Sequence, residues 1–283
     1  MLINLVDIMK LAEEKQFALA AINTPNLECI YAVLDNAEKY KVPVVIMHAE
    51  CHNPIAPLKD IGPYMVKAAE MASVPVCVQL DHGETLECVQ QALDIGFSGI
   101  MYDGSNLPYE ENIANTVKAV ELSHRYGAGI EGEIGRLPTR EVAAVHGMEL
   151  KAKSGPVYTE PEEALEFVQA TGIDCLTPSF GTSHGIYKAA PVLDLERVKR
   201  IKEAVGIPLV MHGGSGVSDE DFRTAIANGI RKINYYSYMA NAGVKAANEL
   251  LAENPTYYHD VAFAVRKAMT ANCEKAMKVF YNL

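Results

Sequence analysis

The chain has 283 residues, and 49% of them are apolar, which is enough to build a large buried core. Its formal net charge of −11 argues against a nucleic-acid or anionic-membrane partner, because both of those partners are negatively charged. The amino-terminal stretch carries acids by residue 7 and has no small-residue cleavage site, and no apolar run reaches the roughly 18 residues of a membrane span. The six cysteines form no C-x-x-C pair, which fits buried thiols, so we expect a cytoplasmic protein.

Eight short apolar runs alternate with segments of helical periodicity. Each run is apolar nearly throughout, which is typical of a strand buried on both faces. The runs predict strands over 17–22, 43–49, 75–81, 99–104, 128–135, 175–180, 208–213 and 230–235. Amphipathic segments predict helices over 26–40 and near 60–72, 85–95, 108–126, 161–170, 194–205, 218–228 and 236–252.

This alternation predicts a parallel sheet in an α/β fold. Eight units of about 30 residues fit a closed (β/α)8 TIM barrel, and a doubly wound sheet is the alternative. No linker or shift in composition interrupts the chain, so we expect residues 1–283 to form one domain with extra helices in the last 30 residues. The long connection over about 136–160 is of the kind that forms a functional lid or a disordered segment.

Polar residues end most of the predicted strands. In a parallel barrel the active site lies at the carboxyl ends of the strands. The polar residues at or just beyond those ends are Asn23, Asp81, His82, Asp103, Glu131, Glu133, His184, Lys188, His212 and Asn234. Three histidines after different strands, with carboxylates nearby, predict a metal site. Three imidazoles suit Zn²⁺ with one position open to substrate, which is the catalytic arrangement.

The stretch "HGGSG", residues 212–216, follows the seventh predicted strand. Its glycines would let backbone amides approach an anion, and the helix that follows would direct its positive amino terminus at the same place. The loops after strands 7 and 8 of such barrels commonly bind phosphate. We therefore predict a phosphate site here. Ser218 is also predicted to be the N-cap of that helix.

With these residues the chain resembles the class II, metal-dependent fructose- and tagatose-bisphosphate aldolases. The motifs that carry the resemblance are "LDHG", "GFSGIMYDGS", "EGEIG", "FGTSHGIYK", "PLVMHGGSGV" and "KIN". It runs from Asn23 to the carboxyl-terminal helices, and it implies a (β/α)8 barrel with Zn²⁺ held by His82, His184 and His212. Asp81 matches the family's acid/base at the C4 hydroxyl, and Glu141 matches the loop residue that moves the C3 proton.

The resemblance also implies further ligands. Glu133 matches a carboxylate that exchanges onto the metal in some members, and Asp103 would belong to a second divalent site. Asn234 would act both in catalysis and in substrate binding. The positions expected to bind the substrate are Asn23, Gly181, Gly185, Lys188, Gly213, Gly214, Ser215, Asn234 and Ser237. Some members use a monovalent cation, Na⁺ or K⁺, near these glycines.

Several positions depart from the family pattern. Arg140 stands where an acid is common, which weakens a second divalent site. Tyr236 adds bulk after the eighth strand, and "HAE", residues 48–50, ends the second strand where Ser or Thr is frequent. His259 takes the place of an arginine that commonly binds the far phosphate. The metal and the C1-phosphate end thus look intact, while recognition of a second phosphate is in question.

The residues themselves agree with metal chemistry. Retro-aldol cleavage needs a base and an electron sink, and no lysine ends a barrel strand to form a Schiff base: Lys188 lies beyond strand 6, and Lys232 lies within strand 8, at odds with its apolar pattern. A metal must then be the sink, with Asp81 as the base. A barrel metallohydrolase would usually carry an H-x-H pair on its first strand, and "FALAAINTPN" has none.

We therefore expect reversible cleavage of a ketose 1,6-bisphosphate, of fructose or tagatose type, to dihydroxyacetone phosphate and an aldehyde such as glyceraldehyde 3-phosphate. Such a reaction belongs to carbohydrate metabolism, for example glycolysis. Two alternatives stay open: a ketose 1-phosphate without the second phosphate, and a non-catalytic relative that binds a sugar phosphate. Members of the family are dimers or tetramers, so a homodimer or homotetramer is expected.

Overall fold

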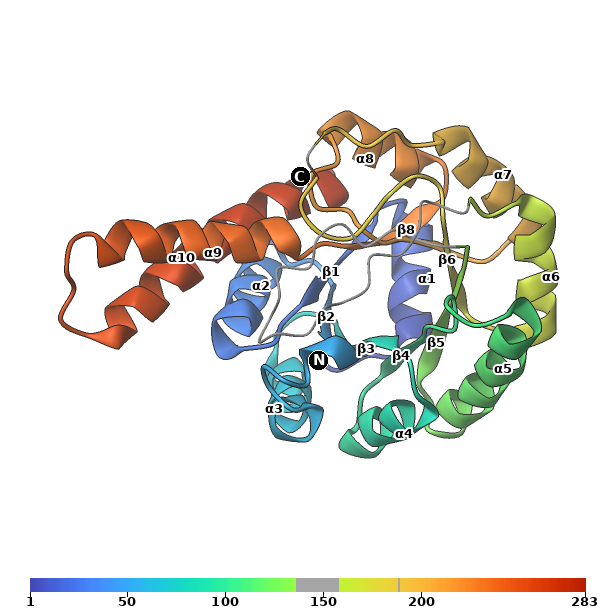
Figure 1. The fold of residues 1–283 in the computed structure, drawn as a ribbon, viewed down its shortest axis with the longest axis horizontal. Coiled ribbons are helices and arrows are strands. Elements are labelled where there is room, and N and C mark those ends of the chain that lie inside the picture. The colour runs from blue at the N-terminus through green and yellow to red at the C-terminus, as the bar shows by residue number, and fades with distance from the viewer. Residues whose placement is uncertain (136–157, 188) are drawn as a thin grey trace.

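The computed structural model describes residues 1–135, 158–187 and 189–283, so most of the predicted lid lies outside the described residues. Eight parallel strands pair in chain order, and the last pairs with the first to close a barrel (Figure 1). The strands are β1 (Leu19–Asn23), β2 (Val44–Ala49), β3 (Val76–Gly83), β4 (Gly99–Tyr102), β5 (Gly129–Ile134), β6 (Cys175–Pro178), β7 (Leu209–Met211) and β8 (Ile230–Asn234). The prediction of a closed (β/α)8 barrel is confirmed, and the doubly wound sheet is wrong.

A helix follows each strand, and all of these helices except the last cover the outside of the barrel (Figure 1). Each predicted helical segment overlaps one of them to within two residues at either end, and a short 3-10 helix, η1 (Glu50–His52), follows β2. The helices are α2 (Leu27–Tyr40), α3 (Leu58–Met71), α4 (Leu86–Ile95), α5 (Tyr109–Arg125), α6 (Pro161–Thr171), α7 (Leu195–Val205), α8 (Asp219–Ala227) and α9 (Ser237–Leu251). Within the described ranges, none of the helices has the length and apolar character needed to cross a bilayer.

One further helix, α1 (Leu5–Lys15), was not among the predicted elements. The side chain of Asn4 caps it by accepting the N–H of Asp7 at 2.8 Å, and its apolar face is buried. The Leu5 amide donates to the Ser98 carbonyl at 3.0 Å, just before β4 begins. The helix therefore packs across the amino-terminal end of the barrel, and Figure 1 shows it within the ring of strands. With that end covered, the carboxyl ends of the strands form the accessible mouth.

The chain ends in α9 and α10 (Tyr258–Phe280), which form a hairpin that projects from the barrel (Figure 1). We call this hairpin the arm. α10 returns along α2, and its Met269, Cys273 and Met277 are buried. Just beyond it, the Tyr281 hydroxyl accepts the Ala20 amide of β1 at 2.9 Å. The extra helical structure expected in the last 30 residues is thus present as one long helix, α10, and the residue after it anchors on the first strand.

Candidate metal centre and active site

The end of β3 is irregular at Asp81 and His82, the predicted acid/base and the first predicted metal ligand. Its register with β4 shifts between Leu80 and Gly83, and His82 has a φ of +43°, in the left-handed region. Consecutive residues of a regular strand point to opposite faces. Here the irregularity brings both Asp81 and His82 to the mouth, where each contacts a residue from the β7–β8 side. The two residues have different partners, as expected, but they share one site.

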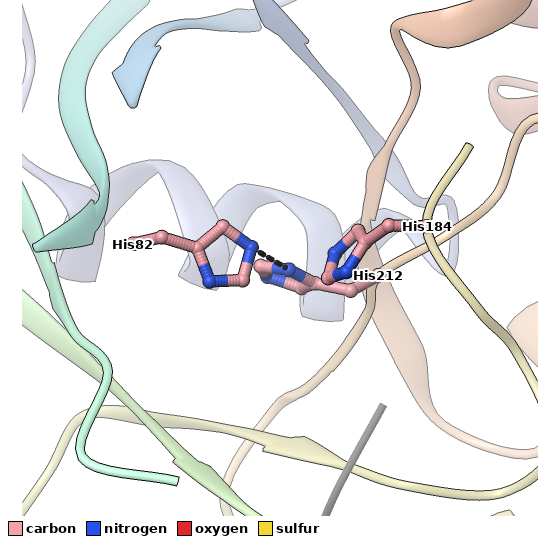
Figure 2. Close-up of side chains that lie close together, drawn as sticks. All are labelled: His82, His184 and His212. Carbon is pink, nitrogen blue, oxygen red and sulfur yellow. Dashed lines mark hydrogen bonds between the residues drawn. The ribbon is translucent and has the colours of Figure 1, made fainter. Parts of the chain in front are cut away.

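Three imidazoles converge at this mouth: His82 from β3, His184 from the loop after β6, and His212 directly after β7 (Figure 2). The ring centroid of His82 lies 4.9 Å from that of His184 and 4.7 Å from that of His212. One ring nitrogen of each histidine lies within 4.8 Å of those of the other two. His212 is buried while the other two are half-buried, so the cluster is open on one side, as a catalytic metal site requires.

Carboxylates set the orientation of two of these rings. Asp103 Oδ2 lies 2.8 Å from His82 Nδ1, and Glu131 Oε1 lies 2.8 Å from His212 Nε2. Because ionised carboxylates only accept hydrogen bonds, these two ring nitrogens carry the hydrogens. When the rings are neutral, as metal binding requires, the lone pairs reside on His82 Nε2 and His212 Nδ1, which are 3.0 Å apart (Figure 2). Tetrahedral Zn–N bonds of about 2.1 Å place two ligand nitrogens about 3.4 Å apart, so the residues fit Zn²⁺.

The charge around His82 also favours a bound cation. Burial lowers the pKa of His82, but the carboxylates of Asp81, Asp103 and Glu133 outweigh it and raise that pKa to about 10. Glu133 Oε2 lies 3.8 Å from His82 Nδ1. His82, Asp103 and Glu133 also form a second group with metal-ligand spacing. In the structure, Asp103 contacts His82 on the nitrogen that faces away from the other histidines, which makes it an orienting partner for that ring.

Asp81 lies between two side-chain amides. Its Oδ2 accepts the Asn23 amide at 2.8 Å, and its Oδ1 accepts the Asn234 amide at 3.1 Å. Burial would raise the pKa of Asp81, but the charges of His82, His212 and Lys232 and the Asn23 hydrogen bond hold it below its ordinary value. Asp81 is therefore an ionised carboxylate, ready to accept a proton. Asn23, predicted as a substrate ligand, is placed as a partner of this group.

A buried ion pair lies beneath the site, and we did not predict its role. Lys232 Nζ contacts Glu131 Oε2 at 2.7 Å and Asn234 Oδ1 at 2.8 Å, and the lysine and the glutamate are fully buried. Since lysine only donates, Asn234 Oδ1 accepts and the Asn234 amide nitrogen must face Asp81. Glu131 in turn holds His212. The signal in the sequence was a charged residue within an apolar strand.

The predicted phosphate loops pack too closely to accommodate larger residues at the glycines. Gly181 and Gly213 have φ values of +116° and +67°. A Cβ atom would lie 2.3 Å from the Val192 carbonyl oxygen at Gly181 and 2.4 Å from the Ser183 carbonyl oxygen at Gly213. Gly214 and Gly185 lie in the same two loops.

A tyrosine that the sequence did not single out joins these loops. The Tyr187 hydroxyl accepts the Ser183 amide at 2.7 Å and donates to the Gly213 carbonyl at 2.9 Å. The hydroxyl therefore fixes the spacing between the β6 loop that carries His184 and the β7 loop that carries the glycines.

The helix whose amino terminus suits an anion is not the one that the sequence predicted. The predicted anion-binding helix, α8, is capped by its own Ser218 and carries three acids in its first turn. In contrast, α9 begins at Ser237 with no side-chain cap and no acid in its first turn. Ser215 Oγ accepts the amides of Tyr236 and Tyr238 at 3.3 and 3.4 Å, which joins the β7 loop to this helix start. The amino terminus of α9 is thus better suited to an anion than that of α8.

Two predicted site residues, Glu141 and Lys188, lie outside the described residues, as does Arg140. Their expected roles stay predictions. The described members of the predicted site fall at the carboxyl end of the barrel, and His184 and His212 lie in the same loops as the predicted phosphate-binding glycines.

Residues 3–282 match the model of a family described as class II fructose-bisphosphate aldolase. The chain is 36% identical over 269 residues to the uncharacterized protein YdjI of Escherichia coli K12, covering 95% of this chain and 94% of that protein. It is 36% identical over 265 residues to the fructose-bisphosphate aldolase of Geobacillus stearothermophilus, covering 91% of this chain and 88% of that enzyme.

Solved structures agree with this relationship. The YdjI aldolase from Escherichia coli K12 superposes with a TM-score of 0.87 at 34% identity, over 99% of this chain and 97% of that one. A crystal structure described as a putative fructose-1,6-biphosphate aldolase from Coccidioides immitis also gives 0.87, at 33% identity, over 98% and 96% of the two chains. Both the fold and the sequence therefore lead to the same assignment, and the chain belongs to the class II fructose-bisphosphate aldolase family.

Proposed function

We propose that the protein is a zinc-dependent aldolase that cleaves a ketose 1,6-bisphosphate, or the corresponding 1-phosphate, to dihydroxyacetone phosphate and an aldehyde. One observation carries the proposal: an ionised carboxylate, Asp81, directly precedes His82 in a centre of three converging imidazoles. Retro-aldol chemistry needs a base and an electron sink next to each other, and this arrangement supplies both from one strand end.

His82 Nε2, His212 Nδ1 and a ring nitrogen of His184 would hold the zinc ion. When bound, Zn²⁺ acts as a Lewis acid that polarises the substrate carbonyl. Asp81 accepts the C4 hydroxyl proton during cleavage and returns it during condensation, while the Asn234 amide keeps the carboxylate in place. Moving the C3 proton is the role we propose for Glu141.

The phosphate of the ketose would lie between the loops after β7 and β8. There Gly213, Gly214 and Ser215 approach the start of α9, where the Ser237 amide can donate to a phosphate oxygen. A monovalent cation, Na⁺ or K⁺, near these glycines belongs to the same proposal. This end of the site fits either substrate class, because both carry the C1 phosphate.

The test is product analysis with the zinc-loaded protein. Fructose and tagatose 1,6-bisphosphates and the matching 1-phosphates are supplied, and dihydroxyacetone phosphate is measured by its reduction with NADH in a coupled assay. Asp81→Asn should lose about 10²- to 10⁴-fold in turnover while its zinc content stays the same. If the zinc-loaded unmutated protein releases no dihydroxyacetone phosphate from any of the four, the non-catalytic alternative is favoured instead.

We further propose that the arm joins copies of the chain into a homodimer or homotetramer. Five large apolar side chains on the arm are exposed to solvent: Val244, Leu251, Tyr257, Tyr258 and Phe263. The surface of a monomeric protein rarely exposes so many large apolar side chains on one hairpin. His259 lies in the first turn of α10, exposed and stacked on Tyr257. Because α10 begins at the tip of the arm (Figure 1), we propose that His259 approaches the substrate of another copy. Sedimentation velocity should show an oligomer, and Phe263→Glu should weaken it.

A further inference from the structure

Two rings from different loops meet across the end of β1. His52 lies in η1 after β2, Tyr236 directly precedes α9 after β8, and their ring centroids are 5.4 Å apart. Since β2 and β8 are the two neighbours of β1, this pair spans the point where Asn23 of β1 holds Asp81. Ala49, three residues before His52, pairs in register with Asp81. The pair thus borders the acid/base. Tyr236 adjoins the phosphate loop through the bond of its amide to Ser215, whereas His52 follows β2, three strands away from β7.

Several polar atoms in this corner are buried and have no hydrogen-bond partner among the described residues. They include His52 Nδ1, Asn23 Oδ1 and, on the ring next to His52, His48 Nδ1. Buried polar atoms are nearly always satisfied in proteins, so atoms such as these indicate a ligand that supplies the missing bonds. A substrate hydroxyl can donate to the Asn23 oxygen and either donate to or accept from an imidazole nitrogen.

The charge of this corner is unfavourable for a phosphate. Glu50 follows Ala49 and accepts the Glu84 amide at 2.7 Å, which brings its carboxylate to the chain segment that contains Asp81. Burial lowers the pKa of His52 to about 4, so this ring carries no positive charge at neutral pH. A phosphate dianion bound here would face carboxylates and a neutral ring, whereas a hydroxyl would meet groups that can bond to it.

We propose that His52 and Tyr236 form the wall that contacts the aldehyde half of the substrate, and that this wall selects a hydroxyl over a phosphate at the far end. The preferred substrate would then be a ketose 1-phosphate. This inference rests on the proposed aldolase function, and it names the substrate class that the same site takes. Both residues are specificity-determining, because they lie beside the carbon chain and not at the reacting bond.

The first measurement needs no variant. The zinc-loaded protein is assayed with fructose 1-phosphate against fructose 1,6-bisphosphate and with the tagatose pair, and kcat/KM should be higher for the 1-phosphates. His52→Arg should then raise the ratio of bisphosphate to monophosphate kcat/KM by about tenfold, because a charge-assisted bond to phosphate is introduced. Tyr236→Phe should raise KM for the 1-phosphates with zinc content unchanged.

The matched control is His124→Arg, which makes the same change on α5 at the opposite end of the barrel, where His124 contacts Asp174 at 3.0 Å. Its substrate ratio should stay that of the unmutated protein. The specificity proposal is wrong if the unmutated protein prefers bisphosphates, or if the two arginine variants have equal substrate ratios. In either case, release of dihydroxyacetone phosphate still supports the aldolase proposal. Absence of that product from all four ketoses overturns both.

Discussion

Lys232 Nζ lies 2.7 Å from Glu131 Oε2 in the barrel interior, and neither side chain is accessible to solvent. The lysine only donates and the carboxylate only accepts, so together they fix the direction of the hydrogen bonds that reach Asn234 and His212. The orientation of the Asn234 amide that holds Asp81 and of the His212 ring thus depends on one buried ion pair. Charge, which is unfavourable in a core, here determines the geometry of the site.

The first prediction concerns that pair. Lys232→Met should lower the free energy of unfolding by about 3–5 kcal/mol, because it leaves the Glu131 carboxylate buried without its counter-charge. Adding Glu131→Gln in the same chain should recover part of the loss. Urea denaturation measures both, and Lys67→Met is the control, since its ion pair with Glu70 is exposed. A cost no larger than that of the control would mean that the buried pair is not needed for stability.

The second prediction separates the roles of two carboxylates near the proposed metal site. Asp103→Asn should weaken zinc affinity about 10- to 100-fold, because Asp103 holds the hydrogen of His82 Nδ1 and so orients the ring. Competition with a chromogenic chelator gives the affinity. Asp81→Asn is the matched control, as its carboxylate contacts amides and no ring nitrogen that we assign to zinc. Equal affinities in the two variants would contradict the orienting role of Asp103.

The third prediction tests the link between the phosphate loops. Tyr187→Phe removes the hydroxyl that joins the Ser183 amide to the Gly213 carbonyl. We expect kcat/KM to fall about tenfold, mainly through KM, because two hydrogen bonds of about 1 kcal/mol each position the loops. Tyr126→Phe removes an exposed hydroxyl bonded to Asp94 and should leave the kinetics unchanged. A change in kcat alone would argue against a role in binding.

Much of the fold was predictable from the regular spacing of short apolar runs in the sequence. Each barrel strand is a short run that is apolar on both faces, and the eight runs have regular spacing, so the parallel barrel followed. α1 was not predicted, because it precedes the first strand and so lies outside the strand–helix alternation. The site residues at strand ends were visible for a related reason: polar groups at the ends of apolar runs stand out.

What the sequence did not reveal depends on contacts between distant segments. The irregular end of β3 is a matter of register with β4, which the residues of β3 do not encode by themselves. Lys232 was noticed as an anomaly, but its partner lies 101 positions away and is identified only when β5 and β8 are placed in one barrel. The same holds for His52 and Tyr236, whose contact crosses the end of β1.

The fourth prediction concerns pH and the docking of α10 on α2. Hydrogen bonds from Tyr40, Lys278 and Lys39 lower the pKa of Glu274 from 4.5 to about 2. A carboxyl group whose pKa is lower in the folded state adds stability above its unfolded pKa, and that stability is lost as pH falls from about 4.5 to about 2. The melting temperature should therefore decline over this window.

Glu274→Gln should remove that part of the acid dependence. Glu70→Gln, which takes one carboxylate from a surface ion pair on α3, is the control and should keep the decline. Identical profiles for the two variants between pH 4.5 and pH 2 would show that the Glu274 cluster does not fasten α10 to α2.

The left-handed backbone of His82 has a consequence for local motion. A non-glycine residue held there costs about 1–2 kcal/mol, and the ring is held at Nδ1 by Asp103 and, in the proposed enzyme, at Nε2 by zinc. Chelating the metal would remove one of these two restraints and let the strand end open. The amide of Asp103, which donates to the Gly83 carbonyl at 2.9 Å, should then exchange its hydrogen up to about tenfold faster. The Ile130 amide, bonded to Asp174, should not change, so exchange would show how the metal keeps this strand end closed.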